Sequence, residues 1–594
     1  MKIRHLVSLA LLVCALTADA ATTLRDPKQA LAGLGAFIER ELQSQKIPGA
    51  AVAVIVNDEV VLLEGYGWRD AAGRKPVTPD TIFPIASITK QFTVASLGTL
   101  ARQGKLDWDK PVRDYMPDFR VGDDYATLRA TPRDLVTHRI GLPRHDFVWY
   151  GSSLSREELY RQLRWLPFNK DIRTRFQYNN FMFMTAGYLA GRLSGRSYEE
   201  HVKATLLEPL GMTRTGFSLA DLDKDADSAL GYELDNKLNL APERYESVEQ
   251  MAPTGGLNST ARDLARWLRM LLRGGELDGK RLLLKSDVAA MMQPNMPIGP
   301  SVFEEFGYDH YGMGLFVSTY RGHEYAEHGG NMPGAAAAVT MFPKEKIGIV
   351  VLTNRSGARL RDGLPFEIAD RLLGLPTSRM VERNAELERK AYAGEEAAKT
   401  AGVSDRKSGT RPSHPLEEYA GRYSESGYGP IDVKHENGAL HLTYHGFTAR
   451  LDHWHYDVFQ APQDRTSDLD SVRVKFETDL EGEVSGIAVP MESNVAPIVF
   501  TRQAPPEMTE RAFLQRFVGT YDLNGIPVEI VLRDDGVLQW VRVGTARDLI
   551  PVRGTLFRIR DLTGVSVEFL ANGSGTIDRL ALHSGSSTIA LKTK

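Results

Sequence analysis

Apolar residues recur with both strand and helix periods between about residue 31 and residue 375. Residues 50–70 have β-branched residues on both sides of Asn57-Asp58, which predicts two strands joined by a tight turn. The helical period predicts helices, each stopping at a glycine, within residues 92–106, 178–195 and 259–275. Strand character returns over 335–354. Helices and antiparallel hairpins that share one core predict an α/β (α+β) domain over residues 21–380, an antiparallel sheet flanked by helices.

The pattern changes beyond residue 380. Residues 381–412 are charged and poor in β-branched and aromatic residues, which predicts a linker, and a helix at its start is compatible with this composition. Period-two alternation then appears twice, because residues 416–442 align without a gap on residues 514–540. The repeat predicts two small all-β domains, lipocalin-like barrels or sandwiches, at 413–505 and 506–594.

Two dipeptides in the aligned copies carry a turn signal. Asn437-Gly438 and Asp535-Gly536 each stand between alternating segments, and both predict two-residue type I′ hairpin turns. Neither copy contains a set of residues suited to catalysis, so both are predicted to be accessory to the first domain.

The first 20 residues have the pattern of a cleaved export signal. Lys2 and Arg4 precede an apolar run from Leu6 to Leu16, and Ala18-Asp19-Ala20 offers small residues at a cleavage site. The run is too short to span a bilayer comfortably, so we expect a periplasmic or secreted protein without a transmembrane anchor.

Composition excludes several classes of function. A net charge of −4 provides no basic field for nucleic acid. Cys14 is the only cysteine and lies in the predicted signal, so disulfides, thiol nucleophiles and zinc–thiolate sites are not expected. His323 and His328 are five apart and lack the His-Glu-x-x-His order, so no metal site is predicted.

Ser87 and Lys90 stand three residues apart at the start of an apolar helix. A serine hydroxyl is a weak nucleophile that needs a base within hydrogen-bond reach. Residues three apart on a helix share a face, and burial favours the neutral amine that can act as the base. Taken alone, this pair would favour a capping serine followed by an ordinary lysine, and the apolar helix that buries the lysine is what favours the catalytic interpretation. The second Ser-x-x-Lys, Ser404 to Lys407, lies in the predicted linker without an apolar face and is not predicted to be a site.

Two later segments carry side chains that suit the same chemistry. Tyr178 and Asn180 open an apolar helix; a tyrosine can relay a proton, and an asparagine offers a donor and an acceptor to an amide. His328-Gly329-Gly330 leads into a strand of small residues, along which a substrate backbone can lie. The N–H groups of Ser87 and Asn331 are the predicted oxyanion donors.

Taken in order, these segments resemble the serine β-lactamase and penicillin-binding protein superfamily, in particular its class C β-lactamase type. The resemblance spans Leu31 to Leu375 and rests on residues 85–117, 132–143, 176–195, 206–217, 253–268 and 327–343. It implies that Ser87 is the nucleophile of an acyl-enzyme and Lys90 its base partner. It also implies that Tyr178 is a general base and that Asn180 orients the substrate amide.

One segment departs from the common pattern of that superfamily. His328-Gly329-Gly330 stands where most members carry Lys-Thr-Gly, and histidine is mostly neutral at pH 7. This resembles the D-aminopeptidase-like branch, whose members also carry two C-terminal β-barrels, and efficient β-lactam hydrolysis is not expected. Tyr178, helped by His328, is predicted to protonate the leaving group.

The sequence thus predicts an exported serine hydrolase that needs no cofactor and acts on small peptides, amides or esters. One alternative is a true β-lactamase or D-Ala-D-Ala carboxypeptidase. An alternative of another class is a non-catalytic receptor for peptidoglycan fragments or β-lactams, which the intact set of Ser87, Lys90 and Tyr178 disfavours. The oligomeric state is not predicted.

Overall fold

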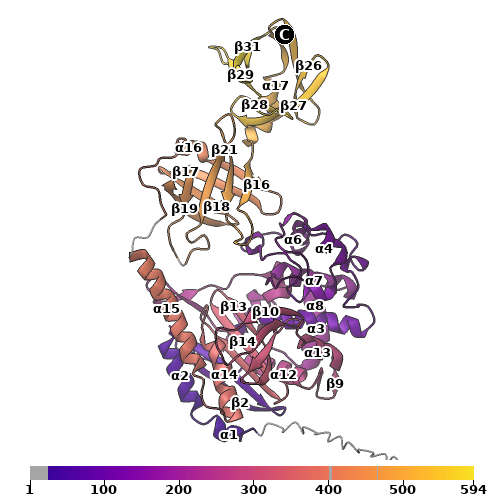
Figure 1. Ribbon diagram of the computed structural model, residues 1–594, viewed down its shortest axis with the longest axis vertical. Helices are drawn as coiled ribbons and strands as arrows, with labels where there is room; N and C mark the ends of the chain where they lie inside the picture. Colours follow the sequence, from indigo (N-terminus) through magenta and orange to yellow (C-terminus); the bar gives the residue numbers. More distant parts are fainter. Residues whose placement is uncertain (1–23, 401–404, 465) are drawn as a thin grey trace, which may run out of the picture.

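The computed structural model describes residues 24–400, 405–464 and 466–594. They form a large α/β domain and two closed β-barrels, arranged in a row with the first barrel in the middle (Figure 1). The predicted export signal (1–20) and Ser404 lie outside the described residues. Within the described part of the chain, no helix is both long and apolar enough to cross a bilayer.

An antiparallel sheet of nine strands forms the centre of the α/β domain, in the order β10-β11-β12-β13-β14-β15-β1-β2-β3. Strands from the two ends of the domain meet where β1 pairs with β15, with Val52 opposite Val351. The predicted hairpin at Asn57-Asp58 is confirmed, with φ of 51° and 72° at the two residues. The strands are β1 (Gly49–Val56), β2 (Glu59–Asp70), β3 (Lys75–Pro76), β10 (Met296–Pro300), β11 (Tyr308–Tyr311), β12 (Phe316–Tyr320), β13 (His323–Met332), β14 (Ala335–Phe342) and β15 (Ile347–Thr353).

Helices cover both faces of this sheet, because the central strands are apolar on both sides. Val52 and Val54 of β1 face α2 (Leu34–Ser44) and α14 (Leu360–Leu373) in one core. Ala51 and Ala53 face the other way, into a second core that includes α12 (Ala261–Leu272). The sheet is therefore the middle of three layers, as the α/β prediction requires.

A helical subdomain on the α12 side contains α3 (Thr89–Arg102), α7 (Asn180–Ser194) and α11 (Ala252–Gly255). Asn179 caps α7, accepting a hydrogen bond of 3.0 Å from the Met182 N–H, and Gly195 ends the helix at φ 71°. Both ends agree with the prediction from sequence. Shorter helices complete the domain: α1 (Pro27–Ala30), α4 (Asp124–Arg129), α5 (Pro132–Leu135), α6 (Arg156–Gln162), α8 (Tyr198–Val202), α9 (Glu208–Leu210), α10 (Leu219–Lys224) and α13 (Lys285–Met291).

Helix α15 (Met380–Thr400) occupies the first part of the segment that composition assigned to a linker. Met380, Val381 and Ala385 are buried in contact with the α/β domain, and Glu388 forms an ion pair of 3.1 Å with the buried Arg355. These few apolar contacts attach the helix to the domain, although most of its other residues are charged or small.

Each predicted C-terminal domain is a closed antiparallel barrel of eight strands. Tyr423 Oη donates to Tyr419 O at 2.7 Å, and the aligned Tyr521 Oη donates to Phe517 O at 2.9 Å, so the sequence repeat is a structural repeat. Barrel 1 consists of β16 (Gly421–Glu425), β17 (Gly429–Glu436), β18 (Ala439–Tyr444), β19 (Phe447–His455), β20 (Val458–Gln460), β21 (Arg473–Thr478), β22 (Val484–Val489) and β23 (Ile498–Arg502). Barrel 2 consists of β24 (Gly519–Leu523), β25 (Ile526–Leu532), β26 (Leu538–Arg542), β27 (Thr545–Arg553), β28 (Leu556–Ile559), β29 (Ser566–Ala571), β30 (Ile577–His583) and β31 (Ser587–Lys592).

The two predicted type I′ turns differ. Asn437 and Gly438 join β17 to β18 directly, with φ of 51° and 74°, as predicted. The prediction for Asp535-Gly536 is wrong, because β25 ends at Leu532 and β26 begins at Leu538, and of the two residues only Gly536 has a positive φ. The longer connection lets Asp535 keep an ordinary backbone conformation, so a single glycine closes the turn.

Candidate active site

Ser87 lies in a short 3₁₀ turn, Ala86–Ile88, that leads directly into α3. Ala86 has φ 43°, a left-handed conformation that costs a residue with a Cβ about 1–2 kcal/mol. The Ser87 side chain opens into a pocket between the sheet and the helical subdomain. The pocket is lined by Ser87, Arg144, Tyr178, Phe316, Glu327, His328, Gly329, Asn331, Arg361 and Asp362.

Lys90 is completely buried beneath Ser87 and faces three acceptors. Its Nζ lies 3.0 Å from Ser87 Oγ, 2.9 Å from Asn180 Oδ1 and 2.9 Å from Thr254 O. The last two atoms only accept hydrogen bonds and each requires one N–H, so the remaining position on the nitrogen points at the serine. Burial, helped by the Arg144 cation, holds the pKa of Lys90 well below its usual value. In the neutral amine the lone pair therefore faces the Ser87 hydroxyl.

Tyr178 lies on the other side of the nucleophile. Its Oη is 2.9 Å from Ser87 Oγ, and the Arg144 guanidinium lies 5.1 Å from the centre of its ring. Burial raises the pKa of Tyr178 above that of a free phenol, and the hydrogen bond to Ser87 and the Arg144 charge only partly oppose this. At neutral pH Tyr178 is thus a protonated donor, placed to return a proton, and Lys90 is the group placed to take one.

Asn180 connects Lys90 with a carboxylate. Its Oδ1 accepts from Lys90, and its Nδ2 donates to Asp146 Oδ1 at 3.0 Å. The Asp146 carboxylate also accepts from Trp149 Nε1 at 2.8 Å and from Arg144 Nε at 2.6 Å. These bonds fix the orientation of the Asn180 amide, so a substrate amide would share Asn180 with Lys90 and Asp146.

His328 is buried on β13, and both of its ring nitrogens have partners within the protein. Nδ1 lies 2.6 Å from Gly329 O, which only accepts, so Nδ1 carries the hydrogen. Nε2 then accepts from Tyr311 Oη at 3.0 Å. Burial lowers the pKa of His328 to about 3, so the ring is neutral. The centre of its ring is 6.2 Å from that of the Tyr178 ring. No direct hydrogen bond therefore supports the predicted assistance of His328 to Tyr178.

Gly330 lies against the turn that carries the nucleophile. A Cβ at this position would be 2.1 Å from Ile85 O, whereas at Gly329 it would meet only the flexible end of Arg361, at 3.0 Å. Close packing of β13 on the nucleophile turn thus requires glycine at position 330. Gly329 and Asn331 line the pocket itself.

We expect Gly330→Ala to displace β13 from the Ser87 turn, with a loss of about 1–3 kcal/mol of stability and a marked fall in kcat. Gly329→Ala is the matched control and should cost less stability, because an arginine side chain can move. Thermal unfolding and turnover of both variants would check this, and equal effects at the two glycines would contradict the packing argument.

A family model described as Beta-lactamase matches residues 34–372, more than half of the chain. The chain belongs to the β-lactamase family. The predicted superfamily and fold are thereby confirmed, and the chain is a serine hydrolase of the β-lactamase fold. A second model, described as a domain of unknown function, matches residues 405–502, which contain barrel 1.

The chain is similar to known proteins over part or most of their length. Unguisins hydrolase ungD of Aspergillus violaceofuscus is 29% identical over 437 residues, covering 68% of this chain and 76% of that protein. Protein flp of Staphylococcus aureus is 24% identical over 322 residues, covering 54% of this chain and 62% of that protein. The octameric penicillin-binding protein homologue from Pyrococcus abyssi has the same fold, with a TM-score of 0.53 at 24% identity, covering 79% of this chain and 100% of that one.

Several residues that contribute to this site were not predicted from the sequence. Thr254 acts through its backbone carbonyl, which gives no signal in a sequence. Arg144 and Asp146 directly follow the segment 132–143 that carried part of the resemblance, and extending that segment would have included them. His138, inside the same segment, packs against Tyr178 at 4.2 Å between ring centres and accepts from the Asn179 N–H at 3.0 Å.

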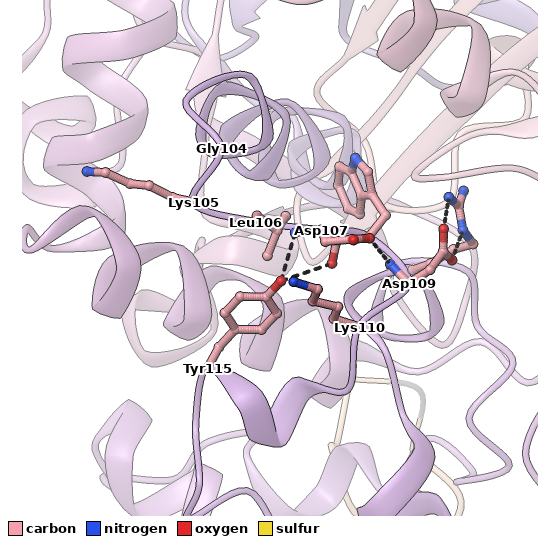
Figure 2. A pocket seen from close by; sticks show the side chains of 9 residues that line it. Gly104, Lys105, Leu106, Asp107, Asp109, Lys110 and Tyr115 are labelled. Atoms are coloured by element: carbon pink, nitrogen blue, oxygen red, sulfur yellow. Dashed lines mark hydrogen bonds and ion pairs between the residues drawn. The ribbon is translucent and has the colours of Figure 1, made fainter.

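Another hollow, at residues 104–115, lies outside this site (Figure 2). Tyr115 Oη accepts from the Asp107 N–H at 2.8 Å, Arg133 pairs with Asp109, and Lys105 points away from the hollow. Its lining holds no serine, cysteine or histidine, so it offers none of the chemistry of the Ser87 pocket.

Proposed function

We propose that this protein is an exported peptidase or amidase, D-aminopeptidase-like in its chemistry, that also hydrolyses small esters through an acyl-enzyme on Ser87. The observation that carries the proposal is the position of Ser87 Oγ, 3.0 Å from Lys90 Nζ and 2.9 Å from Tyr178 Oη. The neutral amine takes the serine proton as Oγ attacks the carbonyl carbon. The phenol gives its proton to the leaving nitrogen or oxygen, so the acyl-enzyme holds an ammonium at Lys90 and a phenolate at Tyr178.

Deacylation uses the same groups in reverse. Water enters where the leaving group departed, and the Tyr178 phenolate takes its proton as the water oxygen attacks the acyl carbon. The Lys90 ammonium returns its proton to Ser87 Oγ as the ester bond breaks. The N–H groups of Ser87 and Asn331 are the proposed oxyanion donors. In this scheme His328 stays neutral and supports the site by packing, since Tyr311 and Gly329 already occupy its nitrogens.

The charges around the pocket favour substrates that have no carboxylate beside the reacting bond, because both arginines of the lining are already paired with carboxylates. Arg144 and Arg361 each have a carboxylate partner, Asp146 at 2.6 Å and Asp362 at 3.2 Å. Glu327 also lines the pocket, and burial raises its pKa to about 8, so at pH 7 it is largely uncharged. A substrate ammonium beside Glu327 would favour its carboxylate form, which supports substrates with a free amine. The relative named for the hydrolysis of unguisins supports hydrolase chemistry of this kind.

A substrate panel tests the proposal. We expect D-Ala-p-nitroanilide to be hydrolysed at least about tenfold faster than its N-acetyl form, p-nitrophenyl acetate to be hydrolysed, and nitrocefin to be a poor substrate. Ser87→Ala is the control for each activity. A clear preference for nitrocefin would favour a β-lactamase. Failure of every substrate, together with no covalent adduct from a fluorophosphonate, would favour the receptor alternative.

A further inference from the structure

Barrel 1 docks directly on a segment of the active site. The first anchor is His145, a fully buried residue of the catalytic domain. Its backbone N–H donates to Glu492 Oε2 of barrel 1 at 3.0 Å, and its Nδ1 lies 2.5 Å from Tyr428 Oη of barrel 1. Nε2 lies 2.9 Å from Pro167 O, which only accepts, so Nε2 carries the hydrogen and Nδ1 accepts from the tyrosine.

A second anchor holds the other end of the same segment. Tyr444 Oη of barrel 1 lies 3.0 Å from Phe147 O and 3.0 Å from Tyr428 O, so its one hydrogen is shared between these carbonyls. His445 Nδ1 lies 3.0 Å from Tyr150 O. Gly151 lies so close to the barrel that a Cβ there would be 2.4 Å from the Phe447 ring. Barrel 1 therefore contacts the segment 145–151 at both ends and at Phe147.

Two charged residues that flank His145 face the catalytic groups. Arg144, directly before His145, lines the pocket and lies over the ring of Tyr178. Asp146, directly after it, accepts from Asn180, whose other end accepts from Lys90. An unbroken chain of contacts thus leads from barrel 1 through residues 144–146 to the base and the nucleophile.

Two further observations separate barrel 1 from barrel 2. The apolar residues of barrel 1 belong to the same continuous core as α3 and α7, whereas barrel 2 has a core of its own. In the gap-free alignment Tyr428 falls on Ile526, and continuing it at the same offset places Tyr444 and His445 on Arg542 and Val543. Val543 is 84% exposed, so the copies differ at the positions that dock in barrel 1.

We propose that barrel 1 is a positioning part of the catalytic centre, which holds Arg144 and Asp146 through His145 and so fixes Asn180 against Lys90. This inference rests on the proposed function, because it assigns a role within the same site. Tyr428 and Glu492 are positioning residues, since they touch neither the pocket lining nor the nucleophile. This proposal departs from the sequence prediction that both barrels are accessory, which stays a prediction for barrel 2.

The test uses the full chain and the matched substitutions Tyr428→Phe and Tyr423→Phe. Each removes one buried hydroxyl of barrel 1, but Tyr423 bonds only within the barrel, to Tyr419 O. We expect Tyr428→Phe to slow fluorophosphonate labelling of Ser87 and kcat about tenfold, because small displacements of catalytic groups are costly. Tyr423→Phe should lower Tm by a similar amount and leave both rates within about twofold of wild type.

A double-mutant cycle distinguishes positioning from general loss of stability. On an Asp146→Asn background, Tyr428→Phe should have little further effect, since both act through the same contact. If Tyr428→Phe does not fold, Glu492→Ala is the second variant and should show the same decrease in the labelling rate and in kcat. Equal rates for Tyr428→Phe and Tyr423→Phe, or full additivity with Asp146→Asn, would overturn the positioning role and leave the proposed function standing. Wild-type protein that is neither labelled nor active would overturn both.

Discussion

Ser87→Ala is expected to lower kcat about 10⁴-fold or more and to abolish covalent labelling. The reason is geometric: Ser87 Oγ is the atom that both Lys90 Nζ and Tyr178 Oη contact, at 3.0 and 2.9 Å. Alanine leaves the pocket and its donors in place but removes the only atom that could bond to the carbonyl carbon.

Intact mass after treatment with a fluorophosphonate measures this directly. Wild-type protein should gain one adduct, and Ser87→Ala none. The control is Ser404→Ala, which removes the other serine of a Ser-x-x-Lys and should be labelled and active like wild type. An adduct that persists in Ser87→Ala, or disappears in Ser404→Ala, would show that the nucleophile is another residue.

The pH dependence of acylation is expected to follow Lys90. The amine acts as a base only without its proton, so kcat/KM should fall as the pH drops through the lowered pKa of Lys90 and should level off well below pH 10.5. Lys90→Met should reduce kcat/KM by about 10³-fold and remove this acidic limb. Lys90→Arg should not restore activity, because a guanidinium does not release its proton in this range.

The assignment of this acidic limb of the pH profile to Lys90 can be tested by changing the charges that face Lys90. Arg144 lowers its pKa and Asp146 raises it, and His138, His328 and Tyr178 also lie nearby. Arg144→Gln should move the limb to higher pH, and Asp146→Asn should move it to lower pH. A limb that stays in place in both variants would assign it to a group other than Lys90.

Local signals were enough to predict much of this protein. Period-two and period-3.6 patterns located the hairpin at Asn57-Asp58 and the helix that ends at Gly195, because turns and caps depend on a few neighbouring residues. Ser87, Lys90, Tyr178 and His328 were predicted by residue type and order, and the structure places Ser87, Tyr178 and His328 in one pocket with Lys90 buried beneath Ser87. The repeat at 416–442 and 514–540 was likewise enough to predict two similar β domains.

The electrostatic states of these groups were decided by tertiary structure alone. Whether Lys90 is neutral depends on burial and on Arg144, 54 positions later in the sequence, and the availability of His328 depends on Tyr311 and Gly329. The attachment of barrel 1 to His145 joins residues 283 positions apart. Desolvation and hydrogen-bond saturation arise only when distant segments pack together. The sequence therefore determined which groups are present. The fold determined the charge of these groups, their partners and the contacts of barrel 1 with the site.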